Sequence, residues 1–416
     1  MIERPAIMDR IRPLVGPSAV KVLAGLRRSD KSTMLKLVVR HLLDQGVPRR
    51  SMMHIDCASQ DAPRIRDGEG LVAHVREAMD ASPDRPVRLF LDEVQELDGW
   101  EAAVRALADG NGADIYLTGS NAGILSDALM EGMPGRVAVI GVRPFSFAEF
   151  LDACRDNVET STVDRHALFR DYLVQGGFPF QTELGFDRRA TVQYVGDLAA
   201  AALFHDVMRP NAIRDADALE RTLRLIARTG GKAVTVADLV AMLRADGPAM
   251  RGRRISPETV TGHLDALARA FLIERVPLED PSTGRAFKIG ERIHLADPAI
   301  RQALGYDNLA AEAMPRVTRG VVLGELRRRG WTVTSGKPSA RSGRGIDFIA
   351  RRAGAVSYLQ VVAAADSPAD ADAAFGALAA MPDNWPKTVL GLGGAPRGRS
   401  GIRGMDVVDW LLDDGA

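Results

Sequence analysis

The stretch GLRRSDKS, residues 25–32, decides the fold class of this chain. It follows a short apolar run at residues 19–24, which predicts a strand, and it leads into an amphipathic segment at residues 31–45, which predicts a helix. A glycine, four variable residues and a Lys-Ser pair between a strand and a helix are typical of a phosphate-binding Walker A loop. The sequence therefore predicts a nucleotide site at the end of its first strand.

Phosphate binding requires backbone N–H groups around the phosphate, a lysine for its terminal oxygens and a hydroxyl for Mg²⁺, at the positive end of a helix. Lys31 and Ser32 meet the last two requirements. We therefore expect ATP to be bound by Gly25, Arg28, Ser29, Lys31 and Ser32, with Ser32 also contacting Mg²⁺.

One residue departs from this pattern, because position 30 is Asp where the pattern has its second glycine. Glycine allows the backbone to approach the phosphate and to adopt φ > 0, whereas a Cβ obstructs the approach. The carboxylate also repels phosphate, by about 4 kcal/mol per charge pair at 4 Å and an effective dielectric of 20. Either the loop binds nucleotide poorly, or Asp30 turns outward toward Arg27 or Arg28 and leaves a weakened site.

A second motif, VRLFLDE at residues 87–93, is an apolar strand that ends in two carboxylates. In this Walker B arrangement Asp92 would hold Mg²⁺ through water, and Glu93 would orient and deprotonate the attacking water. An ordinary acidic turn has the same appearance in isolation, but a Walker A loop in the same sheet favours the catalytic interpretation. The next predicted strand is followed by Ser120 and Asn121, whose polar groups suit a sensor of the γ-phosphate.

Short apolar runs alternate with helical patterns through the first 150 residues. Strands separated by helices imply right-handed crossovers, and so an α/β fold with a parallel sheet and helices on both faces. The predicted strands are residues 19–24, 51–57, 87–91 and 114–118, and the predicted helices are residues 31–45, 71–79 and 100–109.

The pattern changes after residue 150. Residues 145–230 are predicted to be helical, and the following segment to be a helix, a turn, a helix and a hairpin, which together make a winged helix. The last block is predicted to be a second, smaller α/β unit. We expect four parts: an ATPase domain (1–150), a helical lid or linker (151–230), a winged helix (231–302) and the small α/β domain (303–416).

Composition excludes several classes of protein. Lys+Arg and Asp+Glu are equal at 54 each, so no overall charge favours nucleic acid or membrane, and any such surface must be local. Cys57 and Cys154 are far apart, which excludes a disulfide scaffold and a cysteine zinc site. The charged N-terminus does not suit a signal peptide, and no apolar run is long enough to span a bilayer. We therefore expect a cytoplasmic protein that does not bind membranes.

With these motifs in place, the chain resembles a known family, the bacterial and archaeal AAA+ ATPases that carry a winged helix and a restriction-endonuclease-like C-terminal domain of unknown function. The resemblance covers nearly the whole chain through GLRRSDKSTML, LFLDEVQELDGWEAAV, IYLTGSNAGIL, Gly135-Arg136, RPFSFAEF, GGFP, GVVLGELRRRG, GIDFIA and YLQV. It implies a P-loop AAA+ sheet, ATP and Mg²⁺ as ligands, and a homo-oligomer. It also implies that Arg136 is an arginine finger acting on a neighbour's γ-phosphate. An arginine that caps a loop or pairs with Glu131 would look the same in sequence.

Two regions are predicted to contact DNA. In the winged-helix interpretation residues 256–271 form the recognition helix, with exposed positions at Thr259, Thr261, His263 and Asp265. The arginines placed to hold phosphates just before that helix are Arg251, Arg253 and Arg254. The glycine- and serine-rich loop 336–345 offers three more basic residues, Lys337, Arg341 and Arg344. A protein-docking role for the winged helix remains open.

The last block keeps the scaffold of a restriction endonuclease and lacks its catalyst. Glu325 and Asp347 lie where such a nuclease has acidic metal ligands, but Gln360 replaces a carboxylate, and Val362 stands where the lysine is needed. We expect no cleavage of DNA. We expect the two acids to pair instead with nearby arginines, among Arg327, Arg328, Arg329 and Arg344.

The leading hypothesis is an oligomeric AAA+ ATPase that couples ATP and Mg²⁺ to remodelling of, or translocation on, DNA. Its catalytic residues would be Glu93, Asn121 and Arg136, its metal ligands Ser32 and Asp92, and Ser120 would contact the nucleotide. The competing hypothesis is a nucleotide-gated or nucleotide-free interaction protein, which Asp30 favours.

Overall fold

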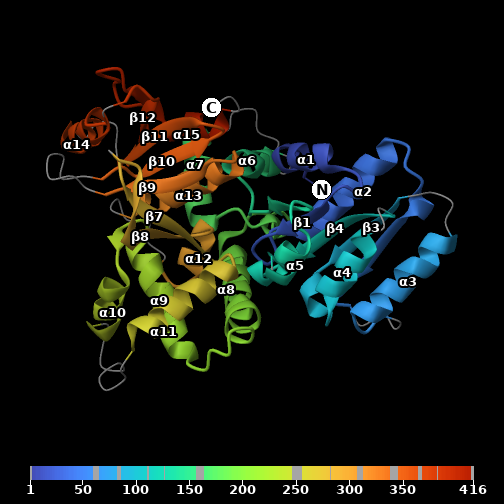
Figure 1. The fold of residues 1–416 in the computed structure, drawn as a ribbon. Coiled ribbons are helices and arrows are strands. Elements are labelled where there is room, and N and C mark those ends of the chain that lie inside the picture. Colours follow the sequence, from blue (N-terminus) through green and yellow to red (C-terminus); the bar gives the residue numbers. More distant parts are fainter. Residues whose placement is uncertain are drawn as a thin grey trace. The chain divides into compact units, whose positions relative to one another are not determined.

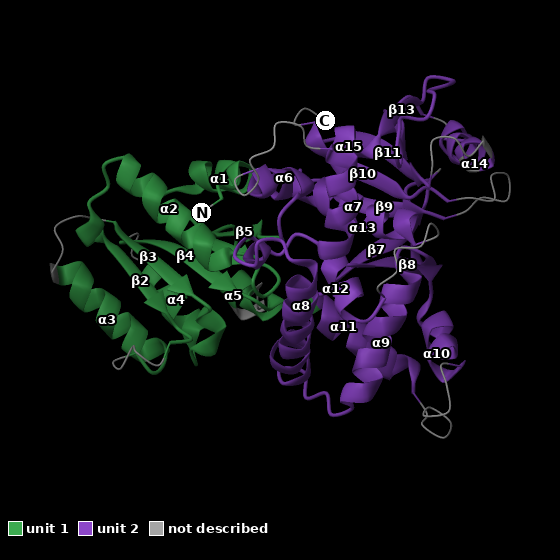
Figure 2. Ribbon diagram, turned by 180° about the vertical axis from the view of Figure 1, so that it is seen from behind, with its two compact units in different colours: residues 1–143, 269–271 green, residues 144–268, 272–416 purple. Residues whose placement is uncertain are grey.

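A computed structural model describes residues 2–59, 65–81, 86–109, 112–125, 127–155, 164–245, 255–281, 283–306, 313–337, 345–363, 368–381 and 383–413. The chain divides into two compact units (Figure 2). Unit 1 comprises residues 1–143 and 269–271, and unit 2 comprises residues 144–268 and 272–416. Among the described residues, no helix combines the length and the apolar composition needed to cross a membrane.

Unit 1 is an α/β fold built on a parallel sheet with the strand order β2-β3-β4-β1-β5 (Figure 1). The strands are β1 (Val20–Ala24), β2 (Met52–Asp56), β3 (Val87–Asp92), β4 (Ala113–Gly119) and β5 (Val137–Gly141). The helices are α1 (Pro5–Ile11), α2 (Lys31–Asp44), α3 (Gly68–Ala81), α4 (Trp100–Ala108) and α5 (Asp127–Gly132). The four predicted strands and three predicted helices are confirmed, and β5, α1 and α5 are additional.

Alternation along the strands explains why helices cover both faces of this sheet. Leu89 and Leu91 face one cluster of buried side chains, which includes residues of α3 and α4. Phe90, between them, faces a second cluster, which includes residues of α1 and α2. Successive strand side chains point to opposite faces, so a strand with apolar side chains on both faces needs a helical layer on each side.

A buried ion pair joins β1 to β4 inside unit 1. Lys21 and Asp114 are 0% and 1% exposed, and Lys21 Nζ contacts Asp114 Oδ1. The remaining ammonium protons are used as well, because Nζ donates to the carbonyl oxygens of Gly16 and Ala19, both at 2.8 Å. Asp114 Oδ2 accepts hydrogen bonds from the Tyr116 hydroxyl and from Gly16 N, both at 3.1 Å. Burial lowers the pKa of Lys21, although Asp114 opposes that shift.

Unit 2 begins with the helices α6 (Phe147–Arg155), α7 (Arg165–Gln175) and α8 (Arg188–Ala202), so the predicted helical region is confirmed. The helices and strands that follow it are α9 (Ala216–Thr229), β6 (Ala233–Val234), α10 (Val236–Ala245), α11 (Pro257–Arg269), β7 (Ile273–Asp280), β8 (Arg285–Leu295) and α12 (Pro298–Ala303). The last block contains α13 (Met314–Arg328), β9 (Thr332–Gly336), β10 (Phe348–Arg352), β11 (Ala355–Val362), α14 (Pro368–Ala379), β12 (Lys387–Gly391), β13 (Arg403–Asp406) and α15 (Val407–Leu412). Of these, β6, α12, β13 and α15 were not predicted.

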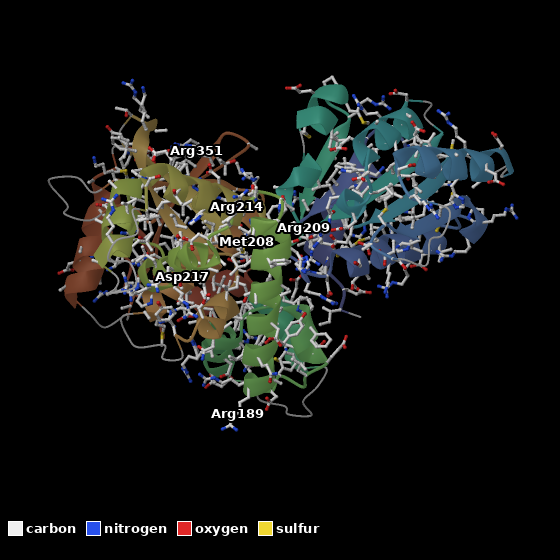
Figure 3. All side chains as sticks on the ribbon, turned by 90° about the horizontal axis from the view of Figure 1, so that it is seen from below. Arg189, Met208, Arg209, Arg214, Asp217 and Arg351 are labelled. Atoms are coloured by element: carbon white, nitrogen blue, oxygen red, sulfur yellow. The ribbon has the colours of Figure 1, made fainter. Side chains whose placement is uncertain are left out.

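One eight-stranded sheet runs through unit 2 in the order β13-β12-β11-β10-β9-β7-β8-β6. The predicted hairpin is β7–β8, and it joins the last block because β7 pairs in parallel with β9. Glu279 strengthens this joint: it is 3% exposed, forms an ion pair with Arg351 at 2.6 Å and accepts a hydrogen bond from Thr334 Oγ1 at 2.7 Å. Arg351 is labelled in Figure 3. The predicted domain boundary after residue 302 therefore falls between elements that share a sheet.

The buried pair in unit 1 generates a stability prediction. Lys21→Met leaves the Asp114 carboxylate buried without its charge partner, so we expect the free energy of unfolding to fall by about 3–5 kcal/mol. Urea unfolding, combined with hydrogen exchange of the β1 and β4 amides, measures the loss. The control is Lys21→Met combined with Asp114→Asn, which removes both charges and should recover part of the stability. A loss below about 1 kcal/mol in the single variant, the size typical of an exposed pair, would contradict the prediction.

Candidate nucleotide site

Residues 25–30 connect the carboxyl end of β1 to the first turn of α2, as the phosphate-loop pattern predicts. Gly25 N donates to Gly119 O at 3.4 Å, and Ser29 N donates to Leu26 O at 3.2 Å. These bonds close the loop beside the end of β4. Lys31 and Ser32 are the first two residues of the helix.

The backbone of the loop is left-handed at two positions that are not glycine. Arg28 has φ 64°, and Asp30 has φ 71° and ψ 29°. This conformation explains why the pattern has a glycine at position 30, since a Cβ makes it unfavourable for most residues and Asp is among the few that tolerate it. Asp30 is thus held in the backbone conformation that glycine would adopt.

Two neighbouring segments fix the shape of the loop. A Cβ on Gly25 would lie 1.9 Å from Val142 O, so no other residue fits there without movement of the backbone. Ser29 Oγ donates to the same carbonyl at 3.0 Å. Arg4, which is 1% exposed, donates to Ser29 O at 3.1 Å and to Arg143 O at 2.8 Å. No motif marked Arg4, because its role depends on contacts with segments far away in sequence.

Lys31 and Glu93 meet at the carboxyl ends of the strands. Lys31 is 3% exposed, and its Nζ lies 3.7 Å from Glu93 Oε1 and donates to Leu26 O at 3.1 Å. Glu93 Oε2 accepts hydrogen bonds from Gln95 Nε2 at 2.5 Å and from Ser120 Oγ at 3.0 Å. Burial alone would raise the pKa of Glu93, but the charge of Lys31 and these two hydrogen bonds hold that pKa below its ordinary value.

Thr118, on β4, holds both acids of the Walker B motif. Its hydroxyl donates to Asp92 Oδ1 and accepts a hydrogen bond from Glu93 N at 2.9 Å. Asp92 is 7% exposed, and Glu93 has a left-handed backbone with φ 48°. Thr118 is not among the predicted site residues, although its place immediately before the Gly-Ser-Asn segment was a usable signal.

The two sensor candidates differ in their contacts. Ser120 is fully buried and donates to Glu93, so it belongs to the cluster that contains Lys31. Asn121 Oδ1 accepts a hydrogen bond from Gly123 N at 2.8 Å, which is the contact of a turn residue. A role for Asn121 in catalysis stays a prediction.

Arg136 lies at the amino-terminal ends of the strands, whereas this cluster lies at their carboxyl ends. Val20, the first residue of β1, donates through its N–H to Arg136 O at 2.8 Å, whereas the phosphate loop follows the last residue of the same strand. Five strand residues span roughly 16 Å. The guanidinium donates to Ala108 O at 2.6 Å and pairs with Asp109 at 3.2 Å, so it caps the end of α4 rather than pairing with Glu131. Within its own subunit Arg136 therefore does not belong to the site.

The residues of the site fit ATP and Mg²⁺ in all but one respect. Lys31 suits phosphate oxygens, and the oxygen donors of Ser32 and Asp92 suit Mg²⁺. In the described part of the chain no cluster of three or more His, Cys, Asp or Glu side chains could hold a metal, so Mg²⁺ would need the oxygens of the nucleotide and water as further ligands. The carboxylate of Asp30 is the exception.

The acids of the last block are neutralised by arginines. Glu325 pairs with Arg328 and Arg329, both at 2.8 Å, which confirms the predicted pairing. Asp347 pairs with Arg319 at 2.9 Å and with Arg292 at 3.7 Å, two arginines that were not among those we named. A pairing of Asp347 with Arg344 stays a prediction, because Arg344 lies outside the described residues.

The side chain of Gln360 also has a structural role. It is fully buried, accepts a hydrogen bond from Asp347 N at 2.6 Å and donates one to Gly345 O at 2.9 Å. These contacts use the polar groups that a nuclease would need for its metal.

Most of the predicted DNA contacts are not placed by the structure. Arg251, Arg253, Arg254, Arg341 and Arg344 lie outside the described residues. Lys337 is described, and its Nζ lies 4.8 Å from the ring centroid of Phe287 on β8.

The prediction that His263 is exposed is wrong. The residue is 3% exposed, and its Nδ1 lies 3.1 Å from Thr222 Oγ1. It falls on the buried stripe of α11 that Val260, Leu264 and Leu267 form at helical spacing.

Two family models match parts of the chain. Residues 17–151 match the family model described as an AAA domain, and residues 166–311 match a domain of unknown function (DUF8612). Unit 1 therefore carries an AAA-type domain with the Walker A and Walker B motifs. An uncharacterized protein of Haemophilus influenzae is 28% identical over 99% of both chains. Another, of Methanocaldococcus jannaschii, is 23% identical over 76% of this chain and 68% of its own.

Similarity to solved structures is weaker. The Aeropyrum pernix ORC2 protein in its ADP form has a TM-score of 0.35 at 14% identity, covering 77% of this chain and 92% of that one. The Aeropyrum pernix ORC1 protein in complex with DNA has a TM-score of 0.32 at 13% identity, covering 75% of this chain and 94% of that one. Neither a ligand nor an activity of this chain follows from similarities of this size.

Proposed function

We propose that the protein is an ATPase that uses ATP and Mg²⁺ to remodel, or translocate on, DNA as a homo-oligomer. The observation that carries the ATPase proposal is the cluster of Lys31, Glu93 and Ser120, which come from the ends of three neighbouring parallel strands. The AAA-domain match at residues 17–151, which contains all three residues, supports the same function.

Each residue has a distinct task in this proposal. Lys31 and the backbone of the loop bind the phosphates, and Ser32 and Asp92 hold the Mg²⁺, which neutralises charge on the phosphate oxygens when it is bound. Glu93 accepts the proton of the attacking water, and Ser120 and Gln95 orient its carboxylate. In this proposal Arg136 acts on the nucleotide of a neighbouring subunit, because within its own chain it lies at the amino-terminal ends of the strands, far from the phosphate loop.

Glu93→Gln tests the catalytic role. We expect ATP turnover to fall by about 10²–10⁴-fold, the usual contribution of a general base, while binding of radiolabelled ATP in a filter assay persists. Glu96→Gln, on an exposed position three residues away, is the matched control and should leave turnover unchanged. Equal turnover by the Glu93→Gln variant and the native chain would exclude Glu93 as the base.

A second candidate function is supported by Asp30, which replaces the glycine at which the loop backbone would approach a phosphate. In this alternative the chain is a nucleotide-gated or nucleotide-free interaction protein that retains the AAA-type fold without hydrolysis. The two candidates share every contact described above, and they differ in whether the loop tolerates a triphosphate beside that carboxylate.

Asp30→Gly separates the two candidates. The backbone is already in a conformation that glycine adopts freely, so the variant removes the Cβ and the charge without refolding the loop. We expect ATP affinity to rise by at least about tenfold, since the charge repulsion removed exceeds 1.4 kcal/mol. Asp30→Asn, which keeps the side-chain size and removes the charge, shows how much of the gain is electrostatic.

Turnover by the native chain at roughly 1 s⁻¹ or faster would overturn the interaction-protein candidate. Turnover that appears only in Asp30→Gly would support it. Unchanged ATP affinity in both variants would show that Asp30 does not face the phosphates.

The DNA part of the proposal is supported by the arrangement of α9, β6, α10, α11, β7 and β8. In this order three helices are followed by a hairpin, and β8 pairs with both β7 and β6, which is the strand pattern of a winged helix. Arg285 and Lys288 are exposed on β8, where a wing presents basic side chains. Lys337 and the five arginines outside the described residues are further DNA contacts in this proposal.

Lys288→Ala tests this surface. We expect weaker binding of duplex DNA at every sequence, and a slope of log affinity against log salt that is smaller by about 1, as for the loss of one phosphate contact. Arg397→Ala removes one exposed charge elsewhere in unit 2 and should change neither quantity. Fluorescence anisotropy with a labelled duplex measures both. Equal effects of the two variants would locate DNA binding elsewhere.

A further inference from the structure

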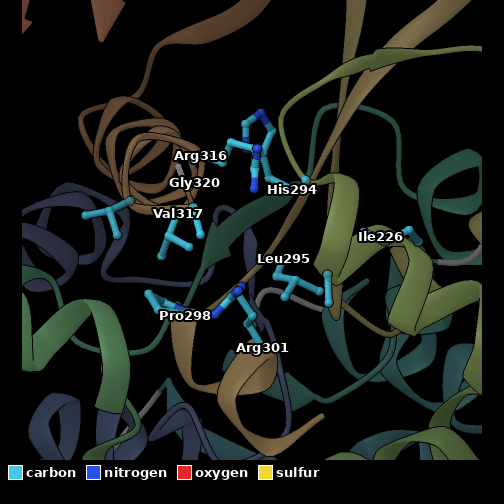
Figure 4. A pocket seen from close by; sticks show the side chains of 12 residues that line it. Ile226, His294, Leu295, Pro298, Arg301, Arg316, Val317 and Gly320 are labelled. Atoms are coloured by element: carbon cyan, nitrogen blue, oxygen red, sulfur yellow. The ribbon is translucent and has the colours of Figure 1, made fainter. Parts of the chain in front are cut away.

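A pocket lies entirely within unit 2, and neither the ATPase nor the DNA proposal uses it. It is formed by the end of α9, the last residues of β8, α12 and the first turns of α13 (Figure 4). Its walls are mostly apolar, with Ile226, Leu295, Pro298 and Val317 among them. An apolar pocket with a few convergent polar groups is the usual form of a small-molecule site.

Two arginines line this pocket, and no described residue of its lining is acidic. Arg301 and Arg316 are both partly buried. Burial, and then repulsion by Arg316, lowers the pKa of Arg301. Arg301 also donates to Tyr306 O at 2.7 Å, which fixes the direction of its side chain. Like charges brought together on an apolar wall favour an anion between them.

His294 adds a polar atom that lacks a hydrogen-bond partner. The side chain is 2% exposed and lines the pocket (Figure 4). Its Nε2 makes no hydrogen bond to any residue that the structure describes. Burial, with the nearby charges of Arg292 and Arg319, lowers the pKa of His294 to about 3, so the imidazole is neutral at pH 7. The Nε2 atom is itself closed to solvent, so His294 acts as a neutral wall of the pocket and adds no charge beside the two arginines.

The N-terminus of α13 also adds positive charge to this pocket. Ala313, its N-cap, and the next turn line the pocket, and no side chain of the described residues caps this end of the helix. The N-terminus of a 15-residue helix carries partial positive charge. The two arginines and the helix end therefore both favour a negative group in this pocket.

We propose that this pocket binds a small organic anion, with its charged head between Arg301 and Arg316 and its apolar body against α9 and α12. The head is a carboxylate or a phosphate monoester, since both accept hydrogen bonds from guanidinium groups. The proposal does not depend on the ATPase function, because all of its residues lie outside the nucleotide site.

Calorimetric titration of the full chain tests the proposal with three probes that share one ring. Benzoate and phenyl phosphate carry the two candidate heads, and benzyl alcohol is the neutral control. We expect at least one anion to bind with a dissociation constant below about 10 mM, and the alcohol to bind at least about tenfold more weakly. The tighter anion identifies the head group.

Two variants locate the binding. Arg316→Gln should weaken the anion by about tenfold, as expected for loss of a charge-assisted hydrogen bond. Gly320→Leu should abolish binding, because a Cβ on Gly320 would meet Leu295 O at 3.7 Å and His294 Nδ1 at 3.9 Å, so the longer side chain occupies the pocket. Gly324→Leu is the matched control on the same helix, since a Cβ there meets nothing within 4 Å.

Circular dichroism establishes that the variants are folded, and Arg316→Gln keeps the test valid if Gly320→Leu is not. Three results would overturn the proposal: no anion binding to the native chain, benzyl alcohol binding as tightly as the anions, or anion affinity unchanged in a folded Arg316→Gln variant.

Discussion

The structure of the nucleotide site depends on one backbone constraint, the left-handed conformation at position 30. The chain must leave β1, turn back over the end of the sheet and enter α2 with Lys31 directed toward Glu93. An L-residue tolerates this conformation only at some cost, so Asp30 is retained against a local preference for glycine. The contacts of Gly25 and Ser29 with Val142 O hold the same loop from the other side.

Much of unit 1 was predictable because its strands are apolar on both faces. β1, β3 and β4 are mostly apolar, and each is buried at almost every position. β5 was missed although residues 137–140 are an apolar run, and in the structure it is a partly exposed edge strand in which only Ile140 is buried. The prediction for His263 failed for a different reason. The residue was expected to be exposed because its side chain is polar, although its helical spacing places it among the buried residues of α11.

The site itself was predictable only where a motif specifies both residue type and position. Lys31, Asp92, Glu93 and Ser120 follow from such motifs, and they lie at adjacent strand ends. The groups that orient them do not, because Thr118 and Arg4 act through contacts with residues 25 or more positions away. The distance between Arg136 and the phosphate loop was likewise hidden, since it requires knowing that β1 and β5 run side by side.

The eight-stranded sheet of unit 2 has a mechanical consequence. A hairpin connected to the rest of the unit only by flexible linkers would tilt freely, whereas β7–β8 is hydrogen-bonded on one side to β9 and on the other to β6. The hairpin is therefore part of one backbone ladder that extends to β13, and it cannot reorient by itself without breaking its hydrogen bonds to β9 or β6.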